Sequence, residues 1–191
     1  MIAERRSNGM SPQDYLNWEA TQSEKYFYVD GEVFAMTGGT IPHNLIAGNL
    51  FALLKAHLRG KNCRTFFADV KVQVTEDGPY HYPDVMVSCD PRDQNAIKLI
   101  RYPCLIAEVL SPSTADYDRG DKFTHYRQIP TLQEYLLLDA NQISVDRYRR
   151  LSERRWDLQT YTAEERLDLT SVGWEGPISL LYEDVRFDGS L

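Results

Sequence analysis

Apolar and polar residues alternate along this chain with two different periods, and these periods predict where helices and strands lie. Residues 11–25 begin with Ser-Pro and are predicted to form a helix, because serine is a good N-cap and proline suits the first turn. Two strand-like runs follow at 26–29 and 32–36, joined by Asp30-Gly31. Asp-Gly between apolar runs is a strong hairpin signal, so we expect a β-hairpin near the N-terminus.

The middle of the chain carries the same two patterns. They predict helices over 42–58 and 117–128, and strands over 63–75, 82–88, 104–110, 134–139 and 143–149. The connection between strand 104–110 and strand 134–139 contains a predicted helix and is long enough for a parallel crossover. We therefore expect a mixed β-sheet flanked by helices, in the α/β or α+β class.

The length of the chain and its charge narrow the picture. A chain of 191 residues fits one domain over 1–191, with a core at about 26–150 and a β-rich extension at about 151–191. The formal net charge of −7 argues against bulk attraction to nucleic acid or to an anionic membrane, but it allows a local basic groove. The chain begins without an apolar signal core and has no run long enough to span a membrane, so we expect a cytoplasmic protein.

Three cysteines occur, at Cys63, Cys89 and Cys104. Their number is odd, no two have CxxC spacing, and each lies in an apolar, strand-like run. We interpret them as reduced core residues rather than as metal ligands or a redox motif.

Two acidic residues are the best candidates for chemistry. Asp84 follows Pro83 at the start of a strand, and Glu108 is the one charged residue in the apolar run 104–110. A buried carboxylate is costly unless it is paired, protonated or bound to metal. Two carboxylates on neighbouring strands would suit Mg²⁺, whereas a salt bridge from Glu108 to Arg101 or Lys122 would be purely structural.

A family resemblance favours the metal site. The segments DGEVFAM, IPHN, YPDVMV, EVLSPST, DRGDK and LQEY occur in this order. They resemble the PD-(D/E)XK restriction-endonuclease-like superfamily, and more narrowly its Uma-type family of restriction endonucleases, over about 26–149. The resemblance implies a restriction-endonuclease-like mixed sheet with an added N-terminal β-hairpin. It also implies an endonuclease that requires Mg²⁺ or Mn²⁺, cuts DNA and forms a homodimer.

The resemblance assigns a role to each residue of the motif. Asp84 and Glu108 would be metal ligands, and Val109 would add its backbone carbonyl. The last motif position should be lysine, but it is Leu110 here. In the Uma-type branch the lysine comes from the following helix, which matches Lys122, and its long side chain could carry an ammonium to the site.

One position of the first hairpin departs from the family pattern. Phe27 stands where the branch has a glutamate, while Glu32 is kept. Glu24 could replace the missing carboxylate only if the chain stays helical up to the hairpin. If that glutamate is a ligand in relatives, a weakened, non-enzymatic binding or regulatory module is the alternative function.

Four further residues are accessory candidates. Lys71 lies on the polar side of strand 63–75, which we expect to be wet or functional, and is the second lysine candidate. His43 begins a helix and could contact a phosphate there, or could only cap and pack. Tyr126 lies four residues after Lys122 and shares its helix face. Gln133 opens a strand that we expect to lie near the same end of the sheet.

Overall fold

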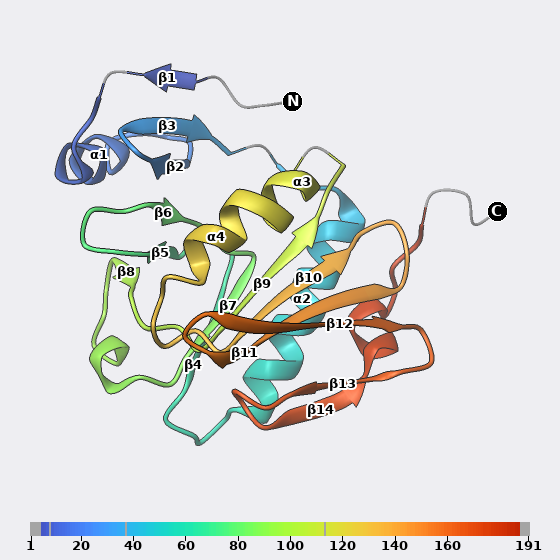
Figure 1. Cartoon of the computed structure of the whole chain (residues 1–191). Helices are drawn as coiled ribbons and strands as arrows, with labels where there is room; N and C mark the ends of the chain where they lie inside the picture. The colour runs from blue at the N-terminus through green and yellow to red at the C-terminus, as the bar shows by residue number, and fades with distance from the viewer. Residues whose placement is uncertain (1–4, 8, 37, 113, 188–191) are drawn as a thin grey trace.

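The computed structural model describes residues 5–7, 9–36, 38–112 and 114–187, which form two six-stranded sheets, a two-stranded ribbon and several helices (Figure 1). The strands are β1 (Arg5–Ser7), β2 (Tyr26–Val29), β3 (Glu32–Ala35), β4 (Arg64–Phe67), β5 (Lys71–Gln73), β6 (Tyr80–His81), β7 (Val85–Ser88), β8 (Leu99–Ile100), β9 (Leu105–Leu110), β10 (Glu134–Asp139), β11 (Ser144–Ser152), β12 (Arg155–Thr162), β13 (Arg166–Leu169) and β14 (Trp174–Pro177). The helices are α1 (Pro12–Glu19), α2 (Ile41–His57), α3 (Ala115–Tyr117), the π-helical turn η2 (Asp118–Lys122), α4 (Phe123–Tyr126), and the 3₁₀ turns η1 (Pro91–Asp93) and η3 (Ile178–Tyr182).

The main sheet has the strand order β12-β11-β10-β9-β7-β4. Strands β9 and β10 are parallel, and the other neighbours are antiparallel. The chain segment between β9 and β10 contains α3, η2 and α4, so the predicted parallel crossover is confirmed. The fold is a mixed α+β fold, as expected.

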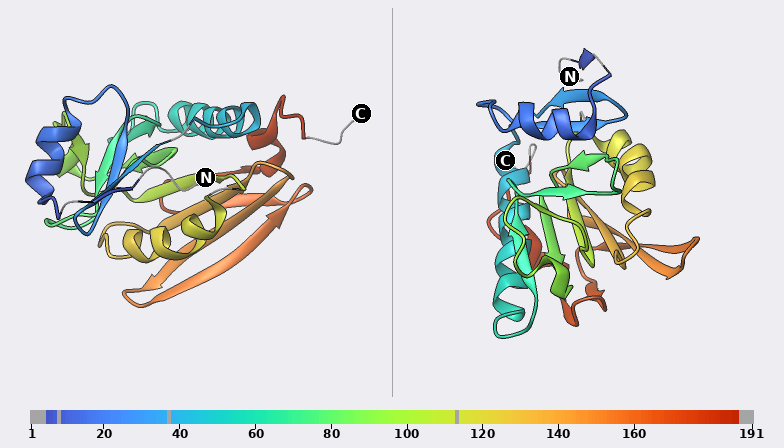
Figure 2. Two further views of the ribbon diagram at one scale, coloured as in Figure 1. Left: turned by 90° about the horizontal axis from the view of Figure 1, so that it is seen from above. Right: turned by 90° about the vertical axis from the view of Figure 1, so that its left-hand side faces the viewer.

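Helices cover both faces of the main sheet (Figure 2). On β9 the side chains of Leu105, Ala107 and Val109 belong to the core cluster that contains α2. Those of Ile106 and Leu110 belong to the cluster that contains Tyr126 of α4. Because side chains alternate along a strand, Glu108 projects toward α4, between Ile106 and Leu110.

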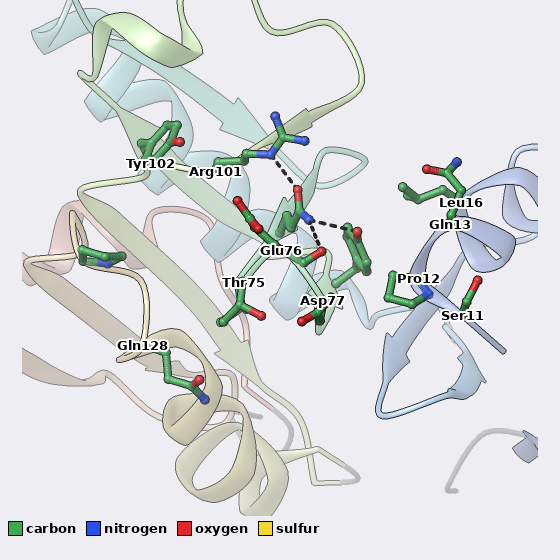
Figure 3. A pocket seen from close by; sticks show the side chains of 14 residues that line it. Ser11, Pro12, Gln13, Leu16, Thr75, Glu76, Asp77, Arg101, Tyr102 and Gln128 are labelled. Carbon is green, nitrogen blue, oxygen red and sulfur yellow. Dashed lines mark hydrogen bonds between the residues drawn. The ribbon is translucent and has the colours of Figure 1, made fainter. Parts of the chain in front are cut away.

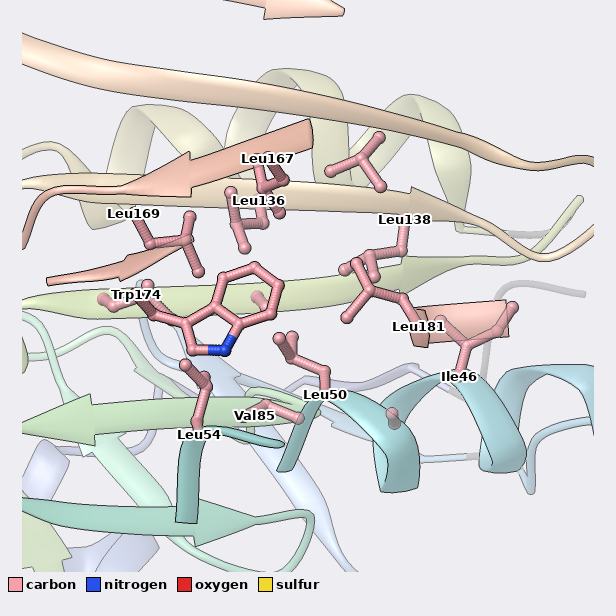
Figure 4. Packing of buried hydrophobic residues seen from close by; sticks show 14 of the residues in the cluster. Ile46, Leu50, Leu54, Val85, Leu136, Leu138, Leu167, Leu169, Trp174 and Leu181 are labelled. Carbon is pink, nitrogen blue, oxygen red and sulfur yellow. The ribbon is translucent and has the colours of Figure 1, made fainter. Parts of the chain in front are cut away.

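The residues after 150 complete the core on the α2 side. Strand β12 pairs with β11 over most of its length, and β13, β14 and η3 pack against α2. Trp174 lies among Leu50 and Leu54 of α2 and Leu136 of β10 (Figure 4). These residues of the β-rich C-terminal segment are therefore part of the main core.

The second sheet has the order β1-β3-β2-β6-β5-β8 and contains the expected hairpin. The predicted single strand 63–75 is wrong, because Ala68 has a positive φ of 51° and the chain leaves the main sheet after β4 to enter the second sheet as β5. The chain returns to the main sheet at β7, which begins at Val85 rather than at residue 82. Asp84 therefore lies where the chain passes from one sheet to the other.

The prediction that all three cysteines are reduced is wrong. Cys63 and Cys89 form a disulfide, and Cys104 is a buried free thiol with its Sγ 3.8 Å from that of Cys89. The cause is strand register: β4 and β7 pair with Arg64 opposite Ser88, which brings Cys63 opposite Cys89.

Among the described residues, no helix is long and apolar enough to cross a membrane.

Candidate functional site

Glu108 is the centre of a buried polar cluster. Its side chain is 3% exposed, and two groups from the covering helical segment contact the same oxygen, Oε1. The Lys122 ammonium lies 2.9 Å from it, and the Tyr126 hydroxyl donates a hydrogen bond of 2.8 Å. Of the two partners expected for a structural salt bridge, Lys122 is present, whereas Arg101 donates to Gln73.

The lysine reaches Glu108 from the π-helical turn η2. Its Nζ also lies 3.1 Å from Oδ1 of Asp118, although that contact lacks the geometry of a hydrogen bond. Asp118 is buried and was not singled out in the sequence. The signal that could have found it is its spacing, since residues four apart on a helix face each other, as Asp118 and Lys122 do here.

Asp84 reaches the cluster from the connection before β7. Its Oδ2 accepts a 2.8 Å hydrogen bond from the Val109 N–H and lies 3.2 Å from Nε2 of His43. Its own carbonyl accepts from the Ala68 N–H at 2.8 Å, which fixes the backbone. The N–H and C=O of one strand residue point to the same side, so the Val109 carbonyl lies on the edge of β9 that faces Asp84.

His43 is held at the first turn of α2. Thr40 caps this helix by accepting from the His43 N–H, and Pro42 occupies the first turn. Gly39 leaves room beside it, because a Cβ there would lie 2.9 Å from Nδ1 of His43 and would force the imidazole to shift. Burial tends to lower the pKa of His43, but the Asp84 carboxylate outweighs burial and raises that pKa. The raised pKa favours the protonated form of His43, which pairs with the Asp84 carboxylate.

The cluster carries an excess of negative charge. Burial raises the pKa of Glu108 to about 8; Lys122 opposes this shift, and the Asp84 and Asp118 carboxylates add to it. Burial tends to lower the pKa of Lys122, but the three neighbouring carboxyl groups outweigh burial and raise it. Lys122 therefore stays charged, and either a proton on Glu108 or a bound cation offsets the crowded carboxylates.

The donor atoms around Asp84 and Glu108 fit a hard divalent cation. Both side chains offer carboxylate oxygens, and the Val109 carbonyl is a third oxygen on the same strand edge. Within the described ranges, no three His, Cys, Asp or Glu side chains form a preassembled cage. Mg²⁺ usually needs only one or two carboxylates, because water and substrate phosphate complete its shell.

Rings form a continuous wall beside this cluster. Phe27 of β2 stacks on Phe34 of β3 with centroids 4.9 Å apart. It also contacts the rings of His81 at 5.9 Å and Tyr117 at 5.7 Å. His81 in turn contacts the ring of Tyr126 at 5.3 Å. The position where the resemblance implies a glutamate is therefore part of an aromatic wall.

Lys71 and Gln133 lie in other surroundings. The predicted wet face of strand 63–75 is wrong, because Lys71 is buried in an ion pair of 2.9 Å with Glu19 of α1. Gln133 precedes β10, whose first residue Glu134 pairs with Leu105, whereas Glu108 pairs with Leu137. At about 3.3 Å per residue, Gln133 is on the order of 13 Å along the sheet from Glu108, so the expectation that both lie near one end is wrong.

The two remaining glutamates lie in the hairpin region. Glu32 begins β3, opposite Val29. Helix α1 ends at Glu19 rather than at residue 25, so Glu24 does not meet the condition set for it as a replacement ligand.

A cavity of about 870 Å³ is separate from this cluster. It lies between α1 and the turn that joins β5 to β6 (Figure 3). Gln73 on its wall donates to Tyr80 and accepts from Arg101. Its lining shares no residue with the carboxylate cluster.

Known proteins resemble this chain in sequence and in fold. Two uncharacterised proteins of Synechocystis sp. (strain ATCC 27184 / PCC 6803 / Kazusa) are 42% and 36% identical to it; the first match covers 93% of this chain and 94% of the relative, and the second covers 81% and 89%. The crystal structure of a "putative nuclease belonging to DUF820" from Anabaena variabilis ATCC 29413 has a TM-score of 0.75 at 15% identity and covers 91% of this chain and 98% of that one. The likeness to this crystal structure is one of fold alone, because the sequence identity is low.

The family model named Uma2 and described as "Putative restriction endonuclease" matches residues 12–179. The match spans most of the chain and includes the whole carboxylate cluster. The chain therefore belongs to the Uma2 family of nuclease-type proteins.

Proposed function

We propose that this protein is an endonuclease that hydrolyses DNA phosphodiester bonds with Mg²⁺ or Mn²⁺. One observation carries the proposal: a buried glutamate, Glu108, lies beside Asp84 and is contacted by a lysine ammonium. Three carboxyl groups around one buried lysine leave charge that the lysine alone does not compensate, which is costly for a purely structural ion pair. Membership of the Uma2 family supports the same activity.

Asp84, Glu108 and the Val109 carbonyl would hold the cation. When bound, it would lower the pKa of a water molecule and neutralise charge that develops on the phosphate. Lys122 orients the attacking water and stabilises the phosphate oxygens with its ammonium. His43 and Tyr126 are positioning residues: the first contacts Asp84 Oδ2 and the second donates to Glu108 Oε1.

Cleavage and cation binding test this proposal separately. Plasmid and single-stranded DNA are incubated with the protein in Mg²⁺ and in Mn²⁺, and Mn²⁺ binding is followed by electron paramagnetic resonance. Asp84→Ala and Glu108→Ala should lose both cleavage and binding of the cation. Glu175→Gln removes an exposed carboxylate paired with Arg166 and should behave as the wild type.

The folding of the variants gives an internal check. Without a cation, Glu108→Ala should stay folded and melt close to the wild-type temperature, because less crowding among the carboxyl groups offsets the lost contacts with Lys122 and Tyr126. If the wild type and Phe27→Glu both leave DNA intact in both cations, the alternative of a non-enzymatic binding module replaces the enzyme.

We also propose a homodimer, because cutting both strands of a duplex requires two sites, and a two-fold pair is the simplest arrangement that supplies them. Sedimentation at micromolar concentration should show the dimer, and a monomer alone would contradict it.

A further inference from the structure

The aromatic wall next to the carboxylate cluster has no role in the mechanism described so far. It begins with Phe27 and Phe34, which face each other across the β2–β3 hairpin with nearly parallel rings, 13° apart. The alternate residues of β2, Tyr26 and Tyr28, are buried in the cluster that contains α1. Phe27 and Phe34 therefore lie on the opposite face of the hairpin, and both remain partly exposed.

This wall leads directly to the proposed cation site. Phe27 contacts the ring of Tyr117, which is also partly exposed and immediately precedes Asp118. Phe27 also contacts His81, and His81 contacts Tyr126, whose hydroxyl bonds to Glu108. A ligand that places a phosphate at Glu108 would extend its neighbouring groups along these rings.

We propose that the partly exposed rings of Phe27, Phe34 and Tyr117 form a stacking platform for an unpaired nucleobase next to the scissile phosphate. The inference rests on the proposed function, because it takes the carboxylate cluster as the phosphodiester site. Aromatic side chains bind nucleic acid by stacking on base faces, and a base in a continuous duplex hides both faces. The preferred substrate is therefore DNA with an unpaired base, either a single strand or a duplex from which a base is flipped out at the cleavage position, and the second of these is also compatible with a two-site dimer.

The charge of the protein agrees with this preference. Binding to duplex DNA relies on many lysine and arginine contacts to phosphates, whereas this chain carries a formal net charge of −7. Stacking adds affinity that does not depend on phosphate neutralisation, so it favours a substrate with exposed bases.

The test is binding of short labelled oligonucleotides, measured by fluorescence anisotropy with Ca²⁺ as an oxygen-bound cation. The probes are a single strand, the matching duplex, and a single strand in which abasic sugars replace the bases. Phe27→Leu should weaken binding of the single strand by roughly 5- to 150-fold and leave binding of the duplex and the abasic strand nearly unchanged. Phe27→Trp keeps an aromatic face and should bind the single strand as tightly as the wild type.

A matched variant controls for loss of an aromatic core residue. Phe51 also pairs with a phenylalanine, Phe67, at 5.5 Å, but packs against the core on the α2 side. Phe51→Leu should leave all three affinities unchanged. Thermal melting of each variant shows whether it is folded at the assay temperature, and Phe34→Leu replaces Phe27→Leu if the latter is not.

The outcomes separate the two proposals. Unchanged single-strand binding by Phe27→Leu, or an equal loss on the abasic strand, overturns the platform. A change in self-association in place of binding assigns the rings to an interface between two copies and also overturns it. If Phe27→Leu binds the single strand more weakly but the wild type cuts no DNA, the platform stands and the nuclease is rejected. If Phe27→Leu binds and cuts DNA as the wild type does, the nuclease stands and the platform is rejected. No binding by the wild type rejects both.

Discussion

Replacing Tyr126 by phenylalanine removes one oxygen atom from the cluster and tests whether this residue positions Glu108. Tyr126 is fully buried, and its hydroxyl donates to Oε1 of Glu108 at 2.8 Å. A hydrogen bond to an uncharged acceptor, such as the protonated Glu108, contributes about 0.5–1.5 kcal/mol, and a protein of this size loses about 2–4 °C of melting temperature per kcal/mol. Tyr126→Phe should therefore melt about 1–6 °C lower.

The functional effect distinguishes positioning from packing. Without the tyrosine, Lys122 is the one remaining side chain among the described residues that contacts Glu108 Oε1, so cation affinity or cleavage should fall about 10- to 100-fold, as is typical when a partner of a metal ligand is lost. The assay is DNA cleavage across a Mn²⁺ titration at a temperature where the variant is folded. Saturating Mn²⁺ should restore part of the rate.

Tyr182→Phe is the matched control for this experiment. Its hydroxyl is also largely buried and donates to the Ser144 carbonyl at 2.6 Å, in the other core cluster. It should lose about 0.5–1.5 kcal/mol of stability and cleave DNA as the wild type does. If Tyr126→Phe is less stable but keeps the wild-type cation dependence, Tyr126 is a core residue and the reasoning is wrong.

Three other changes have definite expected results. Reducing the Cys63–Cys89 disulfide, which spans 26 residues, should cost about 3.5 kcal/mol and lower the melting temperature by about 7–14 °C in calorimetry; equal melting with and without reductant would contradict the bond. Burial lowers the pKa of His81 well below 6.5, so the unfolded chain takes up this proton first and the stability of the fold decreases as the pH falls below about 6.5. His81→Phe should flatten this part of the stability curve relative to the wild type, and an unchanged curve would refute the assignment. Lys71→Met leaves the Glu19 carboxylate unpaired and should destabilise the fold by about 3–5 kcal/mol without slowing cleavage by the folded fraction; a lost rate would return Lys71 to the site.

The sequence predicted correctly those elements whose structure depends on neighbouring residues in the chain. The Asp30-Gly31 hairpin forms as expected, because a two-residue turn depends on its own backbone preferences. Strand β10 matches its predicted range of 134–139, because a short run of apolar residues is most stable as a strand buried on both faces of the sheet. Glu108 was identifiable because a charge in such a run requires a partner.

Features that depend on register or on helix geometry were missed. The Cys63–Cys89 bond follows from the pairing of β4 with β7, which no local pattern encodes. Gln133 was misplaced because a parallel strand starts at the end of the sheet where its neighbour starts. Asp118 was missed because its four-residue spacing from Lys122 does not show which side of the helical segment is buried against the main sheet.

That π-helical turn makes chain length, and not only residue identity, a property of this site. Asp118, Lys122 and Tyr126 are evenly spaced by four residues across the turn, and all three lie on the Glu108 side of the helical segment. Removing one residue within it, such as Gly120, would replace the wide turn with an ordinary α-helical turn and leave Asp118 three residues before Lys122. A single-residue deletion in this segment would therefore keep the aspartate and the lysine on one helix face but shift Asp118 relative to Glu108, although every one of these side chains would still be present.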